Sequence, residues 1–153
     1  MSPHPLSNLE LYRYLSSHGT IPLGGIYFRD TLPHQKQYTR ATFVICNTSK
    51  SSHSRGRHWV CFLVGVAQPE YYDSLGRRPR QVFERFLGSR YTYCTRRLQD
   101  LSLPSCGYFV LFYITQRAKG VSFENIVQDM YAIGDYGIIS AVSSHNTEPL
   151  ARL

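Results

Sequence analysis

Apolar residues fall into short runs along the chain, some continuous and some spaced at helical intervals, and most runs are bounded by Gly, Pro or Ser. Continuous apolar or aromatic runs predict strands at residues 41–46, 59–64, 70–73 and 91–98. Apolar positions three and four residues apart predict helices at residues 7–18, 80–87, 106–117 and 122 to about 133. Helices and strands mix without a regular strand–helix–strand repeat, so an α+β fold is expected.

The first predicted helix has clear boundary signals. Ser7 and Glu10 have the spacing of a capping box, and Gly19 follows the last periodic residue. The next stretch, residues 20–40, is interrupted by prolines and glycines and predicts loops with short extended pieces. No repeat or internal boundary interrupts residues 1–153, so we expect a single domain with a flexible polar tail from about Ser143.

The composition is that of a globular protein, with 42% hydrophobic and 14% aromatic residues in a chain of 153, long enough to bury a core without disulfides. No apolar run reaches about 18 residues and the N-terminus lacks an apolar signal core, so neither a membrane span nor export is predicted. We expect an intracellular, reducing environment in which Cys46, Cys61, Cys94 and Cys106 are free thiols. Their spacing fits no metal site, and no phosphate-binding glycine loop is present.

The net charge of +7 is concentrated in one stretch. Seven arginines, opposed there by a single glutamate, lie between residues 77 and 97: Arg77, Arg78, Arg80, Arg85, Arg90, Arg96 and Arg97. Arginine forms bidentate contacts with phosphate, so one interpretation is a face that binds a polyanion such as nucleic acid. A solvated basic surface that only aids solubility is an equally good interpretation of the pattern.

The strongest chemical signal is the segment LPSCGYF at residues 103–109. Cys106 follows a proline-containing loop and opens an apolar helical run, where the positive end of the helix dipole favours a thiolate. Cys46 and Cys61 lie inside apolar runs, where a thiol packs as a small hydrophobic group. The sequence therefore predicts that Cys106 is a nucleophile, and Gly107 leaves room beside it for a substrate backbone.

A histidine and an aspartate lie at the two ends of a predicted hairpin. His58 precedes one predicted strand, and Asp73 ends the next. A turn centred between Gly65 and Val66 places the two residues opposite each other on one face of the sheet. Asp73 would then orient the imidazole of His58, which would act as the general base. The alternative is that Asp73 only begins the turn Asp-Ser-Leu-Gly.

Two further residues have positions that fit this chemistry. Gln99 ends a predicted strand seven residues before Cys106, so its amide can donate to an oxyanion beside the backbone N–H of Cys106. Trp59 either shields the His–Asp pair from water or fills the core. The order His58, Asp73, Gln99, Cys106 is typical of a cysteine protease.

Four segments resemble the adenain family of viral maturation proteases and, more distantly, the proteases that act on SUMO and other ubiquitin-like proteins. They are PLGGIYFRD at 22–30, ATFVICNT at 41–48 with His58-Trp59 after it, YDSLG at 72–76, and the span from Gln99 to Gly107. Together they cover about residues 20–117. The resemblance implies a papain-like α+β fold with a circularly altered order of elements, a central mixed sheet, and the nucleophile at the N-terminus of a buried helix.

The resemblance also implies catalytic roles for the matching residues. It makes His58 the base, Asp73 the orienting acid, Gln99 the oxyanion donor and Cys106 the nucleophile. The acidic residue is Asp, as in the SUMO proteases, where adenain has Glu. The chain is also markedly shorter than adenain, mainly after the catalytic helix.

A cleft and a set of partners follow from the same resemblance. We place Gly24, Gly25, Trp59 and Gly107 in the substrate-binding cleft. The family cleaves viral precursor polypeptides at Gly-containing sites without a cofactor for the chemistry, and DNA and a short basic peptide stimulate it. The arginine-rich stretch fits DNA, and Cys94 lies roughly in the strand that carries the peptide-linked cysteine of adenain.

The leading hypothesis is a monomeric viral cysteine endopeptidase that matures virion precursor proteins, acting in the virion and the host nucleus and not at a membrane. One alternative keeps the chemistry and changes the substrate, to SUMO or other ubiquitin-like conjugates. The other is a non-enzymatic basic DNA-binding protein on an inactive protease fold.

Overall fold

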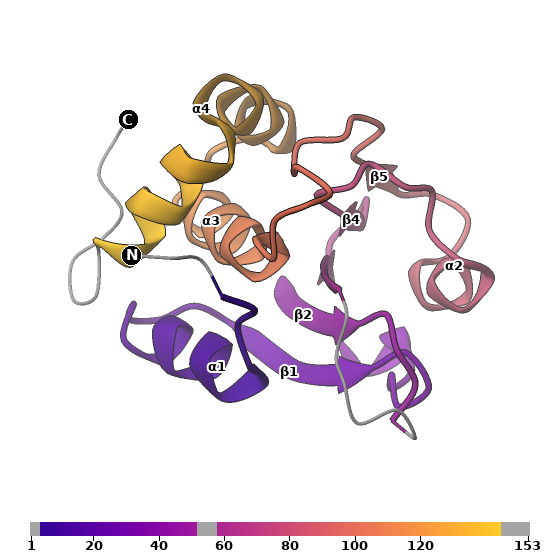
Figure 1. The fold of residues 1–153 in the computed structure, drawn as a ribbon. Coiled ribbons are helices and arrows are strands. Elements are labelled where there is room, and N and C mark those ends of the chain that lie inside the picture. The colour runs from indigo at the N-terminus through magenta and orange to yellow at the C-terminus, as the bar shows by residue number, and fades with distance from the viewer. Residues whose placement is uncertain (1–3, 52–57, 145–153) are drawn as a thin grey trace.

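The computed structural model describes residues 4–51 and 58–144 and has the α+β architecture expected from the sequence (Figure 1). Its helices are α1 (Asn8–Ser16), α2 (Gln81–Leu87), α3 (Cys106–Ala118) and α4 (Phe123–Ser143), with a short 3-10 helix, η1, at Gln35–Gln37. Its strands are β1 (Leu23–Phe28), β2 (Thr42–Asn47), β3 (Trp59–Val64), β4 (Glu70–Tyr72) and β5 (Thr92–Tyr93). Most elements therefore form close to their predicted bounds.

The strands form one mixed sheet in the order β1-β2-β3-β4-β5. Strand β3 is antiparallel to both of its neighbours, β2 and β4, and each edge strand runs parallel to its neighbour. Side chains alternate between the two faces, and both faces are buried. Phe43, Ile45 and Leu63 face one core, whereas Val44 and Phe62 face the other. The sequence runs that looked continuously apolar are thus strands covered on both sides.

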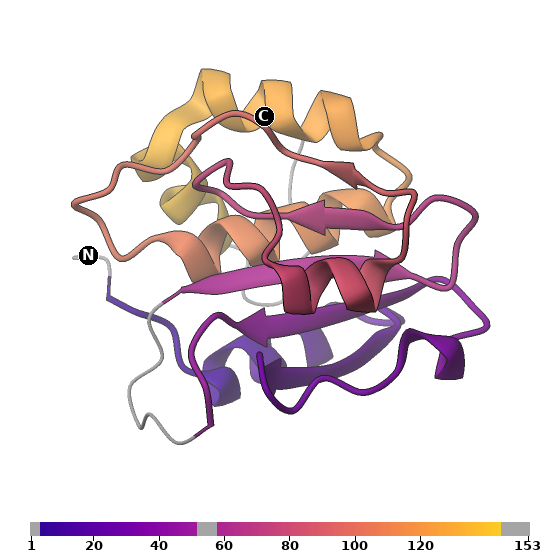
Figure 2. The same ribbon diagram turned by 90° about the vertical axis from the view of Figure 1, so that its right-hand side faces the viewer.

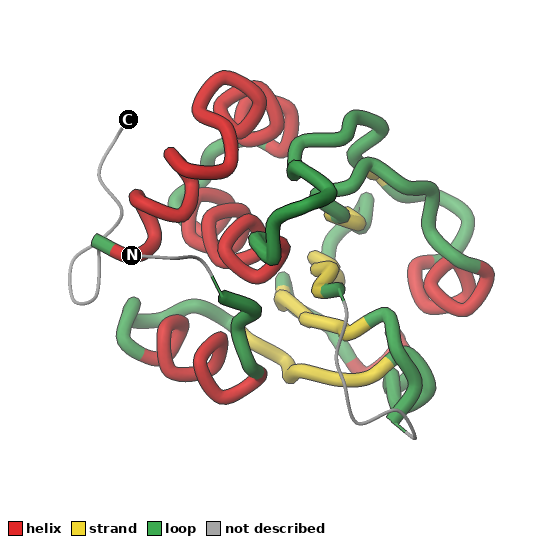
Figure 3. Tube along the Cα trace, viewed as in Figure 1, coloured by secondary structure: helices red, strands yellow, loops and turns green. Residues whose placement is uncertain are grey.

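The helices are divided unevenly between the two faces. Figure 3 shows α1, α3 and α4 on one side of the strands and α2 on the other, and Figure 2 looks onto α2 in front of the sheet. Helix α3 is the centre of the larger core and is buried from Cys106 to Gln116. On the opposite face, Phe83 and Phe86 of α2 pack edge-on against Phe62. The N-terminus of α3 is therefore held by a well-packed scaffold.

Strand β4 is tied to the C-terminal half of α3. Glu70 accepts hydrogen bonds from Nε and Nη2 of Arg117 at 3.0 and 2.9 Å, and a further one from the hydroxyl of Tyr113. Forked guanidinium–carboxylate pairs of this kind have a defined geometry. The pair fixes the position of β4, and of the residue that follows it, relative to α3.

Three segments differ from the expectations. The strand predicted at 91–98 is only two residues long, because β4 offers a short edge and the chain leaves the sheet after Tyr93. The helix predicted to end near Ile133 breaks at Gly134 (φ 76°, ψ 173°) and then continues to Ser143. Strand β1 forms within the stretch predicted as loops with short extended pieces. The predicted flexible tail after Ser143 lies almost wholly outside the described residues.

The hairpin between β3 and β4 has a register two residues away from the predicted one. Leu63 pairs with Glu70, which centres the turn one residue later than the predicted point between Gly65 and Val66. Gly65 has a φ of 74°, and a Cβ there would lie 1.8 Å from the carbonyl oxygen of Arg40. The glycine therefore allows a close backbone approach and does not mark the apex of the hairpin.

Candidate active site

Three segments bring a histidine, an aspartate and a cysteine to the same end of the sheet. His58 immediately precedes β3 and Asp73 immediately follows β4, and since these strands are antiparallel, the start of one lies beside the end of the other. Cys106 is the first residue of α3, which packs against β3. Only 7% of His58, 2% of Asp73 and 8% of Cys106 is exposed, so the cluster is largely removed from solvent.

His58 and Asp73 form a short hydrogen bond although they are not directly opposite each other. If the observed pairing is extended by one residue pair, Asp73 lies opposite Val60. His58 is two residues before Val60 and on the same face, so it lies within diagonal reach of Asp73. Nε2 of His58 and Oδ1 of Asp73 are 2.6 Å apart. The predicted contact is therefore present, while the register from which it was derived is wrong.

Asp73 also begins a turn, as its alternative interpretation predicted. Its Oδ1 accepts the N–H of Leu75 at 2.9 Å, and its carbonyl oxygen accepts the N–H of Gly76 at 2.9 Å. An aspartate that bonds the backbone two residues ahead forms an Asx-turn, which fixes the orientation of its carboxylate. The turn thus positions the same oxygen that binds His58.

The surroundings of His58 favour a protonated imidazole. Burial lowers the pKa of His58, but hydrogen bonds and negative charge from Asp73 and Cys106 outweigh that effect and raise the pKa to about 9. Because Nε2 is bound to Asp73, Nδ1 is the nitrogen that can exchange a proton with Cys106. The backbone N–H of Trp59 also donates to Sγ of Cys106 at 3.4 Å. A donor aimed at the sulfur stabilises negative charge there.

Gln99 has a fixed orientation beside the loop that leads to Cys106. Its Oε1 accepts a hydrogen bond from the hydroxyl of Ser74 at 2.6 Å, and its Nε2 donates to the carbonyl of Leu103 at 2.8 Å. The amide carries two hydrogens, so the second can serve another acceptor. The backbone N–H of Gln99 binds the carbonyl of Ser74 as well. Ser74, the residue after Asp73, therefore links the two halves of the site.

A groove of about 440 Å³ opens beside Cys106. Trp59 and Pro104 line it, and residues 5–8 form one of its walls. The indole N–H of Trp59 donates to the carbonyl of Leu6 at 2.8 Å, which fastens that N-terminal wall to β3. Trp59 thus shapes the groove and also packs against the larger core, as its core interpretation predicted.

The glycines assigned to the cleft have different surroundings. A Cβ on Gly107 would lie 3.0 Å from Cβ of Leu6, so the N-terminal segment fills the space beside it. Gly24 and Gly25 line a neighbouring depression and not the groove just described. A Cβ on Gly25 would meet the ring of Tyr27 at 2.7 Å. Local packing accounts for Gly107 and Gly25, and contact of the three glycines with a substrate stays a prediction.

The other cysteines are buried free thiols. Cys46 and Cys61 are enclosed within strands, and burial raises the pKa of both. Cys94 is 3% exposed and its Sγ donates to the carbonyl of Arg96 at 3.1 Å, so a disulfide with a peptide would require this segment to move.

Within residues 4–51 and 58–144, no three His, Cys, Asp or Glu side chains are placed to hold a metal ion. No helix in the same part of the chain combines the length and the apolar character that crossing a bilayer requires.

The arginine-rich stretch forms an exposed surface around α2 and β5. Its seven arginines are all exposed, and they lie on α2 and on the segments before and after it. Arg78 lies 3.8 Å from Glu84, and the guanidinium of Arg96 lies 3.5 Å from the ring centre of Tyr131. These arginines are accessible from solvent, and their role in binding a polyanion stays a prediction.

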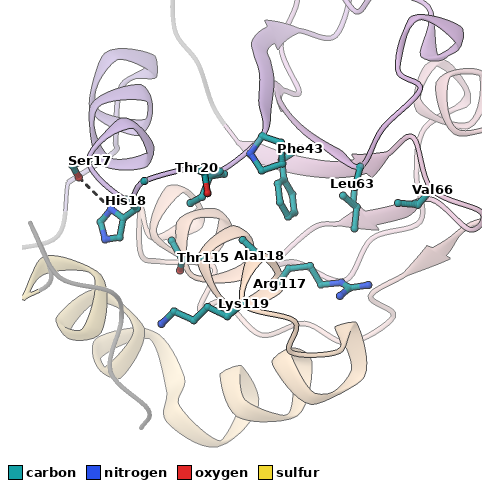
Figure 4. Close-up of a pocket in the computed structure, with 14 residues that line it drawn as sticks. Ser17, His18, Thr20, Phe43, Leu63, Val66, Thr115, Arg117, Ala118 and Lys119 are labelled. Carbon is teal, nitrogen blue, oxygen red and sulfur yellow. Dashed lines mark hydrogen bonds between the residues drawn. The ribbon is translucent and has the colours of Figure 1, made fainter.

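A larger cavity, of about 670 Å³, lies at the other end of α3. Thr115 of α3 and Lys119, the residue after the helix, line one side of it, and Phe43 and Leu63 line it from the sheet (Figure 4). At 1.5 Å per residue, Thr115 is about 13 Å along the helix from Cys106. The predicted catalytic residues do not line this cavity.

The sequence analysis missed two residues that shape the site. Leu6 forms part of the groove wall, and no sequence signal marks it. Asp135 of α4 binds Ser105, the residue before the cysteine, across 30 positions of the chain. The sequence feature that could have pointed to Asp135 is the preceding Gly134, because a lone glycine inside an apolar helical run often marks a break.

Comparison with known proteins gives the fold. The sequence matches no protein-family model and no curated protein. A selenomethionine crystal structure of the ASFV pS273R protease matches with 18% identity over 99% of this chain and 72% of that chain, with a TM-score of 0.66. Another crystal structure of the ASFV pS273R protease matches with 19% identity over 99% of this chain and 71% of that chain, with a TM-score of 0.63. The chain therefore has the fold of the ASFV pS273R protease.

Proposed function

We propose that this chain is a cysteine endopeptidase in which Cys106 is the nucleophile, His58 the general base and Asp73 the residue that orients the base. The observation that carries this proposal is their convergence from three distant segments: His58 binds Asp73 through Nε2 and interacts with Cys106. A buried His–carboxylate pair beside a cysteine at a helix N-terminus is an arrangement that activates a thiol. The shared fold supports the same chemistry.

In the proposed reaction, Nδ1 of His58 takes the thiol proton of Cys106, and the thiolate attacks the carbonyl carbon of the scissile peptide bond. The tetrahedral oxyanion accepts hydrogen bonds from the backbone N–H of Cys106 and from the second amide hydrogen of Gln99. Collapse of the intermediate breaks the C–N bond, and the imidazolium gives its proton to the leaving amine. Water, deprotonated by His58, then hydrolyses the thioester and releases the carboxylic acid and the thiol.

The proposed substrates are viral precursor polypeptides that are cut at Gly-containing sites during virion maturation. The adenain-like motifs and the fold shared with a viral protease support this choice. The groove beside Cys106 has the Trp59 indole in its lining, which provides a flat apolar surface for an extended peptide. We place the reaction in the virion and the host nucleus, with the chain acting as a monomer.

DNA is the proposed activator, and the observation behind it is the exposed arginine surface around α2. Such a surface attracts a polyanion such as DNA. The proposal includes a short peptide linked through Cys94, and the buried thiol would have to become exposed before the disulfide forms.

Covalent labelling tests the proposed nucleophile. A peptide electrophile with Gly next to the reactive carbon is expected to modify Cys106 in the native protein, with the site read by mass spectrometry. His58→Ala should slow the reaction strongly and Cys106→Ala should abolish it, whereas Cys94→Ala, a matched control thiol, should leave it unchanged. A folded protein that binds DNA with steep salt dependence and shows no such labelling would be the non-enzymatic alternative.

A substrate panel separates the two protease hypotheses. Gly-containing virion precursor peptides and folded ubiquitin-like fusions would be compared by kcat/KM, with and without DNA. The aspartate at position 73 is the feature that favours the ubiquitin-like alternative. A clear preference for the folded fusions would replace the proposed substrate while leaving the chemistry intact.

A further inference from the structure

Helix α4 is interrupted at a point that faces the loop before Cys106. Gly134 has φ 76° and ψ 173°, which no other residue type adopts without strain. A Cβ at Gly134 would meet nothing within 4 Å, so the glycine is required by the backbone conformation and not by crowding. The break changes the direction of the chain immediately before Asp135.

The carboxylate of Asp135 holds both ends of the loop between Gln99 and Cys106. Its two oxygens accept the backbone N–H of Asp100 at 3.0 and 3.1 Å, at the start of the loop. Its Oδ2 also accepts the hydroxyl hydrogen of Ser105 at 2.6 Å, at the end of the loop. Hydrogen bonds to an ionised acceptor are among the stronger ones in proteins. One side chain from α4 thus spans the loop that carries the proposed oxyanion donors.

Ser105 differs from the other serines that precede helices in this protein. Ser7 and Ser122 have extended backbones, with ψ of 165° and 153°, and their side chains cap α1 and α4 through the N–H groups of Glu10 and Asn125. Ser105 has φ −101° and ψ 0° and makes no side-chain cap bond; its hydroxyl instead points toward α4 and donates to Asp135. Serine at this position normally caps the helix.

The backbone angle ψ of Ser105 sets the direction of the next N–H, which belongs to Cys106. A capping serine would turn toward the extended region and rotate the peptide unit between the two residues. Its present ψ near 0° lies in a sparsely populated region that is common at active sites. The bond to Asp135 is therefore suited to keep the Cys106 N–H in one direction.

We propose that Asp135 is a positioning residue for the oxyanion site: it draws the Ser105 hydroxyl away from the start of α3 and thereby fixes the direction of the Cys106 N–H. The inference rests on the proposed function, since it assigns this N–H to a reaction that forms an oxyanion. Within the described part of the chain, the hydrogen bonds of Asp135 go to Asp100 and Ser105, so its effect reaches the site through the loop.

Two reactions of the same thiol separate this role from a purely structural one. Hydrolysis of a Gly-containing peptide amide passes through an oxyanion, whereas alkylation by iodoacetamide is a displacement that forms none. Asp135→Asn is expected to lower kcat about 10- to 100-fold, because a misdirected oxyanion donor loses part of its effect. The KM and the alkylation rate should change less than about 2-fold, as they do not depend on that donor. Asp129→Asn, on the same helix, is the matched control and should change neither reaction.

A double substitution tests the mechanism itself. Asp135→Ala removes both acceptor oxygens, so the released hydroxyl of Ser105 can cap the helix, and adding Ser105→Ala to it should remove the competing cap and recover part of the lost kcat. Gly134→Ala should reproduce the Asp135→Asn pattern by moving the carboxylate.

The outcomes are distinguishable. Equal losses in hydrolysis and alkylation, or unchanged hydrolysis in Asp135→Asn, would overturn the inference and leave the proposed function standing. A native protein that is alkylated at Cys106 and hydrolyses none of the peptides would overturn both.

Discussion

The two halves of the candidate site are built in different ways. His58 and Asp73 lie at the ends of β3 and β4, and the backbone ladder of the sheet places them. Gln99 and Cys106 flank a loop, and side chains from elsewhere place that loop: Ser74 holds its start, and Asp135 holds both ends. The first half depends on secondary structure, and the second on a few long-range hydrogen bonds.

This difference predicts how each half responds to mutation. A sheet distributes its stability over many backbone bonds, so the removal of one side chain there changes the chemistry and leaves the geometry. A loop held by single side chains changes its geometry when one of them is lost. Substitutions in the first half should therefore act on proton transfer, and those in the second half on the oxyanion site.

The largest effect is expected for His58→Gln. Glutamine keeps the approximate size and a hydrogen-bond donor toward Asp73, but it cannot take a proton from Cys106. The kcat for peptide hydrolysis should fall at least about 10⁴-fold, while the circular dichroism spectrum stays that of the native fold. Tm should fall at neutral pH, because the substitution removes the stabilisation that the raised pKa of His58 represents. His34→Gln, on an exposed loop, serves as the control. Activity within 10-fold of native in His58→Gln would rule out His58 as the base.

A smaller loss is expected for Asp73→Asn. The amide can still accept from Leu75, but it no longer supplies the charge that favours the imidazolium and the tautomer of His58. We expect kcat to fall roughly 10²- to 10⁴-fold, with the pKa of His58 moving down from about 9 toward its ordinary value. The shift would be read from the ring-proton signals of His58 in an NMR titration. An unchanged titration would show that the carboxylate does not govern the base.

The same pair gives the stability of the native protein a pH dependence. Because the folded-state pKa of His58 is raised, its contribution is fully present below the unfolded pKa of about 6.5 and is lost as the pH rises through about 9. The free energy of unfolding should therefore decrease across this interval, by less in Asp73→Asn than in the native chain. Chemical denaturation at several pH values measures the difference. A rising or flat profile in the native protein would contradict the raised pKa.

The half of the site that the sheet positions, His58 and Asp73 (the sheet-borne half), was also the easier one to predict from sequence. Apolar runs identified β3 and β4, and antiparallel pairing alone brought His58 near Asp73. The register was wrong because Gly65 looked like a hairpin apex, whereas its positive φ serves a contact with the backbone of Arg40. Pairing within a hairpin is a local property, so an error of two residues still left the side chains within reach.

For the half of the site that flanks the loop, Gln99 and Cys106 (the loop-borne half), the residues could be predicted from sequence. The hydrogen bonds that position them could not. Gln99 and Cys106 were identified by their spacing and by the helix that follows. The bonds from Ser74 to Gln99 and from Ser105 to Asp135 join residues 25 and 30 positions apart. No periodicity relates such pairs, because they depend on how separate segments pack together; the Ser105–Asp135 bond, for example, requires α4 to pack against α3.

Gln99→Ala should cost less than loss of the base or its partner. The change removes one oxyanion donor and leaves the backbone N–H of Cys106, so kcat should fall about 10²- to 10³-fold. Alkylation by iodoacetamide should stay within about 2-fold, since it forms no oxyanion. Gln128→Ala, on the exposed face of α4, is the matched control. A parallel loss of alkylation would mean that Gln99 supports the nucleophile and not the oxyanion.

The smallest effect is expected for Ser74→Ala, which separates the orientation of the Gln99 amide from its presence. The hydroxyl of Ser74 and the carbonyl of Leu103 hold the two ends of the amide, and without the hydroxyl only the bond from Nε2 to Leu103 orients the hydrogen that faces the oxyanion. The backbone bond from Gln99 to the carbonyl of Ser74 remains, so the loop keeps its start. Loss of a single buried hydrogen bond of this strength corresponds to about a 10-fold lower kcat, with KM unchanged.

In a Gln99→Ala background the same substitution should have no further effect on kcat, because there is no amide left to orient. Independent, additive losses would instead place Ser74 on the sheet-borne side of the site, acting through its neighbour Asp73.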